Sequence, residues 1–408
     1  MTINDLTFEA EAASVLGELH SALAGVVDRL RPPVGRPTDL HRLLKLDHRL
    51  SWSVFNAATA QDARALASLL PGRRAMERFF LAAAAHGVPA ETVDGARGAF
   101  ERFERSIARH ARSRDAFEVM VAGIGGAAPP EDDSGAEAKH KRAMFRAASL
   151  LWGRQARVFF GSVVVSPGPS TPALGLLDCL LVKGMIGLHQ TRHDVPLTTV
   201  ARHVYAPSKG DPSEPMPLEA IDPGESAPDA VGLLRDFCSQ PTPTFRIKAH
   251  EERFTTHELV PSGIGASSEV TYFTGHVGHG GAAMSSSVPG SQLSLTKIVE
   301  MPIEVYIGDI LMHESLWDER LPAVKVYVSP VVGSTVEFHD SDLLPFAERA
   351  MYLGRGPSSG RTPLVPRYVE MMSYAMERVG WNPEEFRVFR CHVDHPVLST
   401  RIRMTFRH

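Results

Sequence analysis

The chain has 408 residues but only three cysteines, Cys179, Cys238 and Cys391, which lie far apart. This scarcity argues against a disulfide framework and fits a reducing compartment. The N-terminus lacks the basic start and apolar run of a secretory signal. Long apolar runs are missing too, because the longest candidate, 174–188, is interrupted by Asp178 and Lys183 and is too short to span a membrane. These absences predict a cytoplasmic protein with no membrane partner.

The sequence also lacks an excess of charge of either sign. Lys and Arg together number 43 and Asp and Glu 47, which gives a formal net charge of -4. The whole molecule therefore offers no general attraction for a polyanion, and any contact with nucleic acid has to come from a local patch. No phosphate-binding G-x-x-x-x-G-K-[ST] loop, H-E-x-x-H pair or dinucleotide-binding glycine fingerprint occurs. Nucleotide-driven and zincin-type chemistry are thereby disfavoured.

The composition is that of an ordinary globular protein, with 43% hydrophobic and 22% charged residues. The length predicts more than one domain. Residues 1–122 carry apolar residues at helical spacing and predict a helical domain, whose first helix ends at the prolines of 31–33. Gly, Pro and acidic residues at 123–136 predict a linker. The remaining 137–408 predict an α+β domain, in one piece or as two subdomains.

Runs of β-branched and aromatic residues predict strands throughout 137–408. They fall at 157–166, 198–205, 244–249, 269–273, 303–310, 324–328, 386–393 and 400–406. Helices are predicted at 137–154, 343–353 and 365–379, and the proline-rich stretch 207–228 predicts a long surface loop. Strands and helices do not alternate regularly. The predicted fold class is therefore α+β, an all-helical N-terminal domain followed by a mixed or antiparallel sheet.

The segment 38–56 has the spacing of two short helices separated by a tight turn. The first helix is predicted over 39–44, with Thr38 as its N-cap. The turn is predicted at 45–48, with Leu46 reaching into the core, and the second helix from Arg49 onward. Leu50 and Val54 are four residues apart, so they are expected to face inward together.

The same segment carries polar residues of the kinds that contact DNA. The outer side of the second helix is expected to present Arg49, Ser51, Ser53 and Asn56 to base edges. Arg42, Lys45, Arg73 and Arg74 are expected to contact phosphates. Between Arg29 and Arg78 there are ten basic and four acidic residues, a local excess of six positive charges in an acidic protein. Such a cluster can neutralise several phosphates, which makes binding depend on salt.

The pattern of 38–56 resembles the helix-turn-helix superfamily of bacterial transcriptional regulators. The resemblance covers about twenty residues and has three departures. His41 stands where a small residue is common, Lys45 stands at the turn glycine, and Trp52 stands where a small polar residue is usual. The longer arrangement resembles uncharacterised bacterial proteins with a helix-turn-helix-like N-terminal segment. It implies a regulator that binds double-stranded DNA as a homodimer, with a C-terminal domain for ligand sensing or oligomerisation.

Other interpretations stay open. Segment 38–56 is also compatible with a helical hairpin that only packs the N-terminal domain. His276 and His279, in the glycine-rich stretch 275–281, and Cys391 and His395 are weak metal-ligand candidates, because imidazole and thiolate are common metal ligands. A site near 275–281 would make the protein an enzyme or a small-molecule-binding protein. A non-catalytic assembly protein is the third alternative.

The G-x-S-x-G at 356–360 is interpreted as a loop. The sequence specifies no cofactor or ligand.

Overall fold

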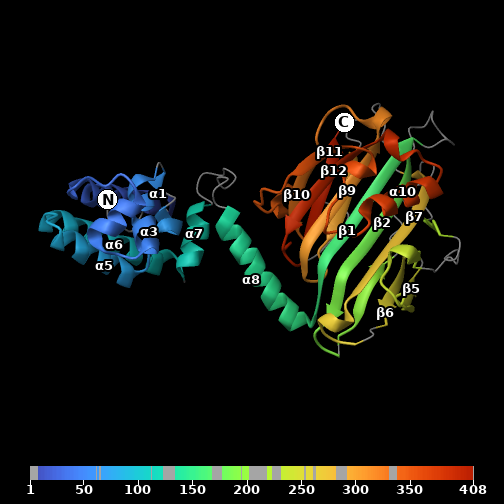
Figure 1. Cartoon of the computed structure of the whole chain (residues 1–408), viewed down its shortest axis with the longest axis horizontal. Coiled ribbons are helices and arrows are strands. Elements are labelled where there is room, and N and C mark those ends of the chain that lie inside the picture. The colour runs from blue at the N-terminus through green and yellow to red at the C-terminus, as the bar shows by residue number, and fades with distance from the viewer. Residues whose placement is uncertain are drawn as a thin grey trace. The chain divides into compact units, whose positions relative to one another are not determined.

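A computed structural model describes residues 8–60, 62–63, 66–111, 113–122, 134–167, 177–193, 195–201, 218–222, 231–251, 254–260, 263–281, 292–329 and 338–407. The chain divides into two compact units, Met1–Ala136 and Glu137–His408, which we call the helical unit and the C-terminal unit (Figure 1). Among the described residues no helix is both long and apolar enough to cross a membrane.

The helical unit contains seven helices among its described residues up to Ala122. They are α1 (Phe8–Arg29), α2 (Pro37–Leu44), α3 (His48–Thr59), α4 (Leu66–Leu69), α5 (Arg73–Ala85), α6 (Ala90–His110) and α7 (Arg114–Ala122). The helix breaks coincide with proline and glycine. Pro37 lies in the first turn of α2, where its missing N–H is not needed, and Gly72 and Pro89 immediately precede α5 and α6.

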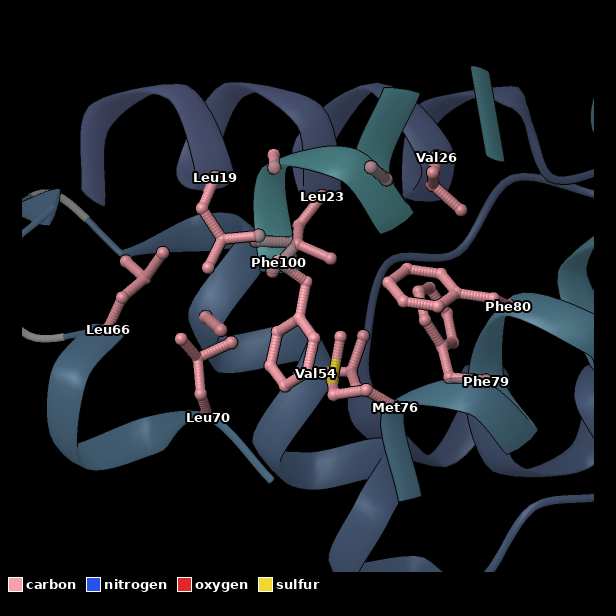
Figure 2. Packing of buried hydrophobic residues seen from close by; sticks show 14 of the residues in the cluster. Leu19, Leu23, Val26, Val54, Leu66, Leu70, Met76, Phe79, Phe80 and Phe100 are labelled. Atoms are coloured by element: carbon pink, nitrogen blue, oxygen red, sulfur yellow. The ribbon is translucent and has the colours of Figure 1, made fainter. Parts of the chain in front are cut away.

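Apolar stripes from these helices form one core (Figure 2). Its labelled members are Leu19, Leu23 and Val26 of α1, Val54 of α3, Leu66 of α4, Leu70, Met76, Phe79 and Phe80 around α5, and Phe100 of α6. All of them are 5% exposed or less. Leu40 and Leu44 of α2 belong to the same core as Val54 of α3. Both helices therefore pack against the centre of the unit.

Helix α8 (Ser134–Trp152) crosses the boundary at Glu137, and the C-terminal unit is then built mainly of strands. They are β1 (Arg154–Pro167), β2 (Leu177–Gln190), β3 (Leu197–Ala201), β4 (Glu219–Ala220), β5 (Phe245–Glu251), β6 (Phe254–Leu259), β7 (Val270–Gly281), β8 (Gln292–Ile298), β9 (Ile303–His313), β10 (Ala323–Val328), β11 (Ala350–Arg355), β12 (Phe386–Asp394) and β13 (Thr400–Arg407). Two further helices are α9 (Gly356–Ser359) and α10 (Tyr368–Arg378), and short 3-10 helices lie at 235–237, 266–268, 314–316, 340–342 and 383–385.

The main sheet has seven strands in the order β11-β12-β9-β1-β2-β7-β4. Its long strands lie side by side, and α10 covers part of one face (Figure 1). β1 and β9 are parallel, whereas the other pairs are antiparallel, so the sheet is mixed. Two three-stranded sheets, β10-β13-β8 and β3-β6-β5, add to the unit. Residues of β8, β10 and β13 share a core with the face of the main sheet opposite α10.

The structure confirms the α+β class and corrects two parts of the secondary structure. The helix predicted at 343–353 is wrong: Leu343 follows a 3-10 turn and 350–355 form β11, which pairs with β12. The stretch 177–190, not predicted as a strand, is the long central strand β2. The first helix of segment 38–56 begins at Pro37, so Thr38 lies inside it and Arg36 is the N-cap residue.

Candidate nucleic-acid interface

The segment 37–59 is a pair of helices joined by a three-residue turn. α2 ends at Leu44, and Lys45 adopts the left-handed conformation, with φ 51° and ψ 35°. Glycine adopts this conformation most readily, so Lys45 occupies the position where a turn glycine is favoured. Asp47 then caps α3, because its carboxylate accepts a hydrogen bond of 2.8 Å from the Leu50 amide. The turn is thus fixed by local backbone chemistry.

Apolar side chains on both sides of the turn face the core, as the sequence predicts. Leu40, Leu44, Leu46, Leu50 and Val54 are all 5% exposed or less. The bulky His41 of α2 contacts the first residue of α3. Its ring stacks on that of His48, with centroids 3.7 Å apart, and its Nδ1 is hydrogen-bonded to the Leu46 carbonyl. His41 therefore links α2 to the turn and to the start of α3, and these contacts accommodate its large ring.

The outer side of α3 differs from the prediction at one residue. Arg49 is exposed, and Ser53 and Asn56 are half-buried. Ser51 is 0% exposed, and its hydroxyl has no hydrogen-bond partner, so the prediction that Ser51 faces base edges is wrong. The inward face of α3 is wider than the Leu50–Val54 pair indicates, because Ala57 and Ala58 are buried as well. Ser51 lies seven residues before Ala58, about two helical turns, so it falls within that face.

Trp52 takes the outward position, and sequence reasoning missed it as a surface residue. Its side chain is 53% exposed on α3. Asn56 lies one turn further along, and its Nδ2 donates a hydrogen bond of 2.8 Å to the Trp52 carbonyl. The outer side of α3 is therefore formed by Arg49, Trp52, Ser53 and Asn56. The sequence does carry a signal for this surface. Trp52 precedes Asn56 by four residues, and residues four apart lie on the same side of a helix.

The basic residues around the turn divide into paired and unpaired groups. Arg78 forms an ion pair of 3.3 Å with Asp47, which joins α5 to the turn, and Arg73 pairs with Glu104 of α6. The predicted phosphate contact of Arg73 thus competes with an internal partner. Within the described residues, no ion pair holds the other exposed cations of this region, which are Arg36, Arg42, Lys45, Arg49 and Arg74. Their charges are available to an anionic partner.

The four weak metal candidates do not form one site. His276 lies on β7 opposite Leu181, whereas His279 pairs with Asp178, whose side chain is buried on the other face of β2. Strand alternation therefore separates the two imidazoles. Within the part of the chain that the structure describes, no group of three or more His, Cys, Asp or Glu side chains could hold a metal ion.

Cys391 and His395 are also unsuited to a shared metal. Cys391 is 0% exposed, and burial raises the pKa of its thiol to about 12, which disfavours the thiolate that a metal requires. His395 follows the end of β12 with φ 47°, and its ring packs against Phe145 of α8. Burial lowers the pKa of His395, and the nearby Arg142 contributes in the same direction.

The G-x-S-x-G stretch has some of the local structure of a nucleophile elbow, since β11 precedes it and α9 begins at Gly356. Ser358 is exposed, and no histidine is hydrogen-bonded to it among the described residues. A serine needs an adjacent base to act as a nucleophile. The interpretation of this stretch as a loop is wrong, because 356–359 form α9. The Gly360 carbonyl accepts a hydrogen bond of 2.7 Å from the buried Arg390.

Comparison with protein-family models and with curated proteins gave no match for this chain.

Proposed function

We propose that the protein is a transcriptional regulator that binds double-stranded DNA through α2, the turn and α3. The observation that carries this proposal is the set of exposed cations without ion pairs around that turn, Arg36, Arg42, Lys45, Arg49 and Arg74. They lie in a protein whose net charge is -4, so the local excess is not a property of the whole chain. Cations without ion pairs, on and beside one pair of helices, suit a phosphate backbone.

The residues of α3 would divide the work of recognition. Arg49 lies in the first turn of α3, the part of a recognition helix that meets base edges in the major groove. Its guanidinium can donate two hydrogen bonds to a guanine, whereas the Asn56 amide can donate one to N7 of an adenine and accept one from its N6 amino group. Arg36, Arg42, Lys45 and Arg74 would contact phosphates on either side of the groove. Trp52 would face the sugars or the thymine methyl groups.

The regulator would act as a homodimer in the cytoplasm. Two-fold symmetry places a pair of recognition helices on successive turns of the same groove, which increases both affinity and site length. The C-terminal unit would supply ligand sensing or self-association. A helical hairpin without DNA contacts is the competing explanation, and it predicts no preference of the protein for any DNA sequence.

Capture of fragmented genomic DNA by the purified full-length protein, followed by sequencing, tests the proposal. We expect enriched sites that are lost in a variant combining Arg49→Glu with Asn56→Ala. Arg105→Glu is the matched control, because Arg105 is an exposed arginine of α6 without an ion pair among the described residues. The control should retain the enriched sites. No enrichment by the native protein, or equal loss in both variants, would contradict base reading by α3.

The dependence of binding on salt tests the phosphate contacts separately. If four of the cations neutralise phosphates, affinity should fall by about 10²-fold between about 50 and 200 mM salt. Arg42→Gln should weaken binding to all sequences alike and make the salt dependence shallower by about one phosphate. A salt dependence unchanged in Arg42→Gln would remove this residue from the interface.

A further inference from the structure

Two lysines extend into the interior of the C-terminal unit from different sheets. Lys183 of β2 lies opposite Gly161 of β1, on the face of the main sheet that packs against the β10-β13-β8 sheet. Lys297 of β8 extends toward the same face, since its Nζ lies 3.7 Å from the centre of the Phe159 ring. That ring leans over Gly161, where an added Cβ would lie 3.2 Å from it. Phe159 thus contacts Lys297 and leans over Gly161, the residue that pairs with Lys183 across the two strands.

The surroundings of the two lysines are apolar and still open. Leu181 and Cys179 precede Lys183 on the same face of β2, and Leu295 precedes Lys297 on β8; all three are half-buried. Both lysines are half-buried as well. On its other side, the Phe159 ring stacks with Tyr306, with centroids 6.1 Å apart. The ammonium groups therefore lie beside an aromatic and aliphatic surface that is incompletely covered.

These lysines lack the partners that other buried charges of this unit have. Arg390 pairs with Asp309 at 2.7 Å, and Lys141 bridges Glu137 and Glu348. By contrast, neither Lys183 nor Lys297 forms an ion pair or a conventional hydrogen bond within the described ranges. A cation taken out of water without a counter-ion is costly, so two neighbouring ones require an explanation.

The electrostatics agree with this lack of compensation. Burial lowers the pKa of Lys297 to about 8; the Glu300 carboxylate acts in the opposite direction, and the Lys183 ammonium lowers the pKa further. Burial also lowers the pKa of Lys183, against the effect of Glu300. The Glu300 carboxylate therefore does not bring the pKa of Lys183 or of Lys297 back to its ordinary value. An anion placed between the two ammonium groups would do so.

We propose that Lys183 and Lys297 bind a small anionic molecule, whose carboxylate or phosphate lies between the two ammonium groups and whose apolar part packs against Phe159. The two cations supply the counter-charge, and the half-buried leucines supply the apolar contact. In the regulator proposed above this molecule would be the effector, and only that role depends on the proposed function. Binding itself is a property of the C-terminal unit and is measured without DNA.

Pyridoxal 5′-phosphate is a suitable probe, because it carries both an aldehyde and a phosphate. The neutral lysine amine condenses with the aldehyde to an imine and releases water, and borohydride then reduces the imine to a stable secondary amine. At pH 7.5 an amine with a pKa of about 8 has about 10²-fold more of the neutral form than an ordinary lysine. Peptide mass spectrometry of the full-length protein should find Lys297 labelled at least about 10-fold faster than the exposed Lys139.

Three comparisons make the test decisive. Lys183→Gln should slow labelling of Lys297 by about 10-fold or more, since it removes both the phosphate partner and the neighbouring charge. Lys183→Arg keeps the cation and should restore most of the labelling, and Lys139→Gln should change nothing. Millimolar benzoate should protect Lys297 and raise the melting temperature of the native protein but not of Lys183→Gln. Uniform labelling of all lysines, or labelling of Lys297 that neither benzoate nor Lys183→Gln affects, would overturn the proposal.

Discussion

Ser51 of α3 is a polar residue inside the helical unit, with 0% of its surface exposed. The sequence predicts an outward position for Ser51, because serine is polar and lies two residues from both Arg49 and Ser53. The structure buries it completely, and its Oγ has no partner. A buried hydroxyl without a hydrogen bond costs free energy, and alanine favours a helix more than serine.

Ser51→Ala should therefore raise the free energy of unfolding of the helical unit by about 1 kcal/mol. Binding to any DNA site should stay unchanged, because the side chain does not reach the surface. Urea denaturation followed by circular dichroism measures the first effect, and titration with a captured DNA site measures the second. A loss of DNA affinity in this variant without a loss of stability would mean that Ser51 is exposed to DNA after all.

Also at the residue scale, the sequence predicts which side chains of α3 face inward and which face outward, because this follows from their spacing along the helix. Leu50 and Val54 face inward because they are four residues apart, and Arg49 faces outward because it lies on the opposite side. The partners of the cations were not predictable. Glu104, which pairs with Arg73, is 31 positions away in sequence, and nothing in the spacing of either residue indicates that α5 and α6 bring them together.

At the scale of elements, the sequence predicts a strand correctly where its residues are of types that strands favour. Where a strand is made of residues that also suit a helix, the prediction from sequence fails. The stretch 343–353 is rich in Leu and Ala and looks helical, yet 350–355 pair with β12 because an edge of the main sheet is available there. β2 is covered on both faces, so it lacks the alternation of a half-exposed strand. Long-range pairing decides both cases.

One buried ion pair links three of these elements. Asp309 of β9 accepts two hydrogen bonds from Arg390 of β12, of 2.8 and 2.7 Å, and a third of 2.7 Å from the Tyr368 hydroxyl of α10. Asp309 is 0% exposed and Arg390 6%. Removing one partner leaves an uncompensated charge in the core.

Arg390→Met should accordingly lower the free energy of unfolding of the C-terminal unit by about 3 to 5 kcal/mol. The double variant Arg390→Met, Asp309→Leu should be less destabilised than the single one, because no charge is then left unpaired. Denaturant titrations of both proteins give this comparison. If the free energy of unfolding of Arg390→Met lies within about 1 kcal/mol of that of the native protein, water reaches the Asp309 carboxylate.

At the scale of the whole molecule, the two units differ in the groups that titrate at alkaline pH. All tyrosines and cysteines lie after residue 136. Burial raises the pKa of Cys179 and of Cys391 to about 12 and holds the pKa values of Tyr306 and Tyr368 well above 10. An unfolded chain loses these protons at the ordinary values of 9.0 and 10.0, whereas the folded unit keeps them.

Stability of the C-terminal unit should therefore fall as pH rises above about 9, since the unfolded state then binds fewer protons than the folded state. Lys297, between about 8 and 10.5, and Lys183 act in the opposite sense, because their folded pKa values are lowered, but the two thiols and two phenols outweigh them. Because the units have separate cores, calorimetry should show two transitions. Between pH 8 and 11 the transition of the C-terminal unit should move to lower temperature by more than that of the helical unit, and equal shifts would contradict this assignment.

Trp52 gives the helical unit an optical property of its own. No other tryptophan and no tyrosine occurs in residues 1–136, so this indole alone accounts for the long-wavelength ultraviolet emission of that unit. It is 53% exposed on the outer side of α3, beside the residues proposed to meet DNA. If Trp152, Trp317 and Trp381 are replaced by phenylalanine, the fluorescence of the protein becomes a built-in, dye-free signal from the centre of the proposed interface.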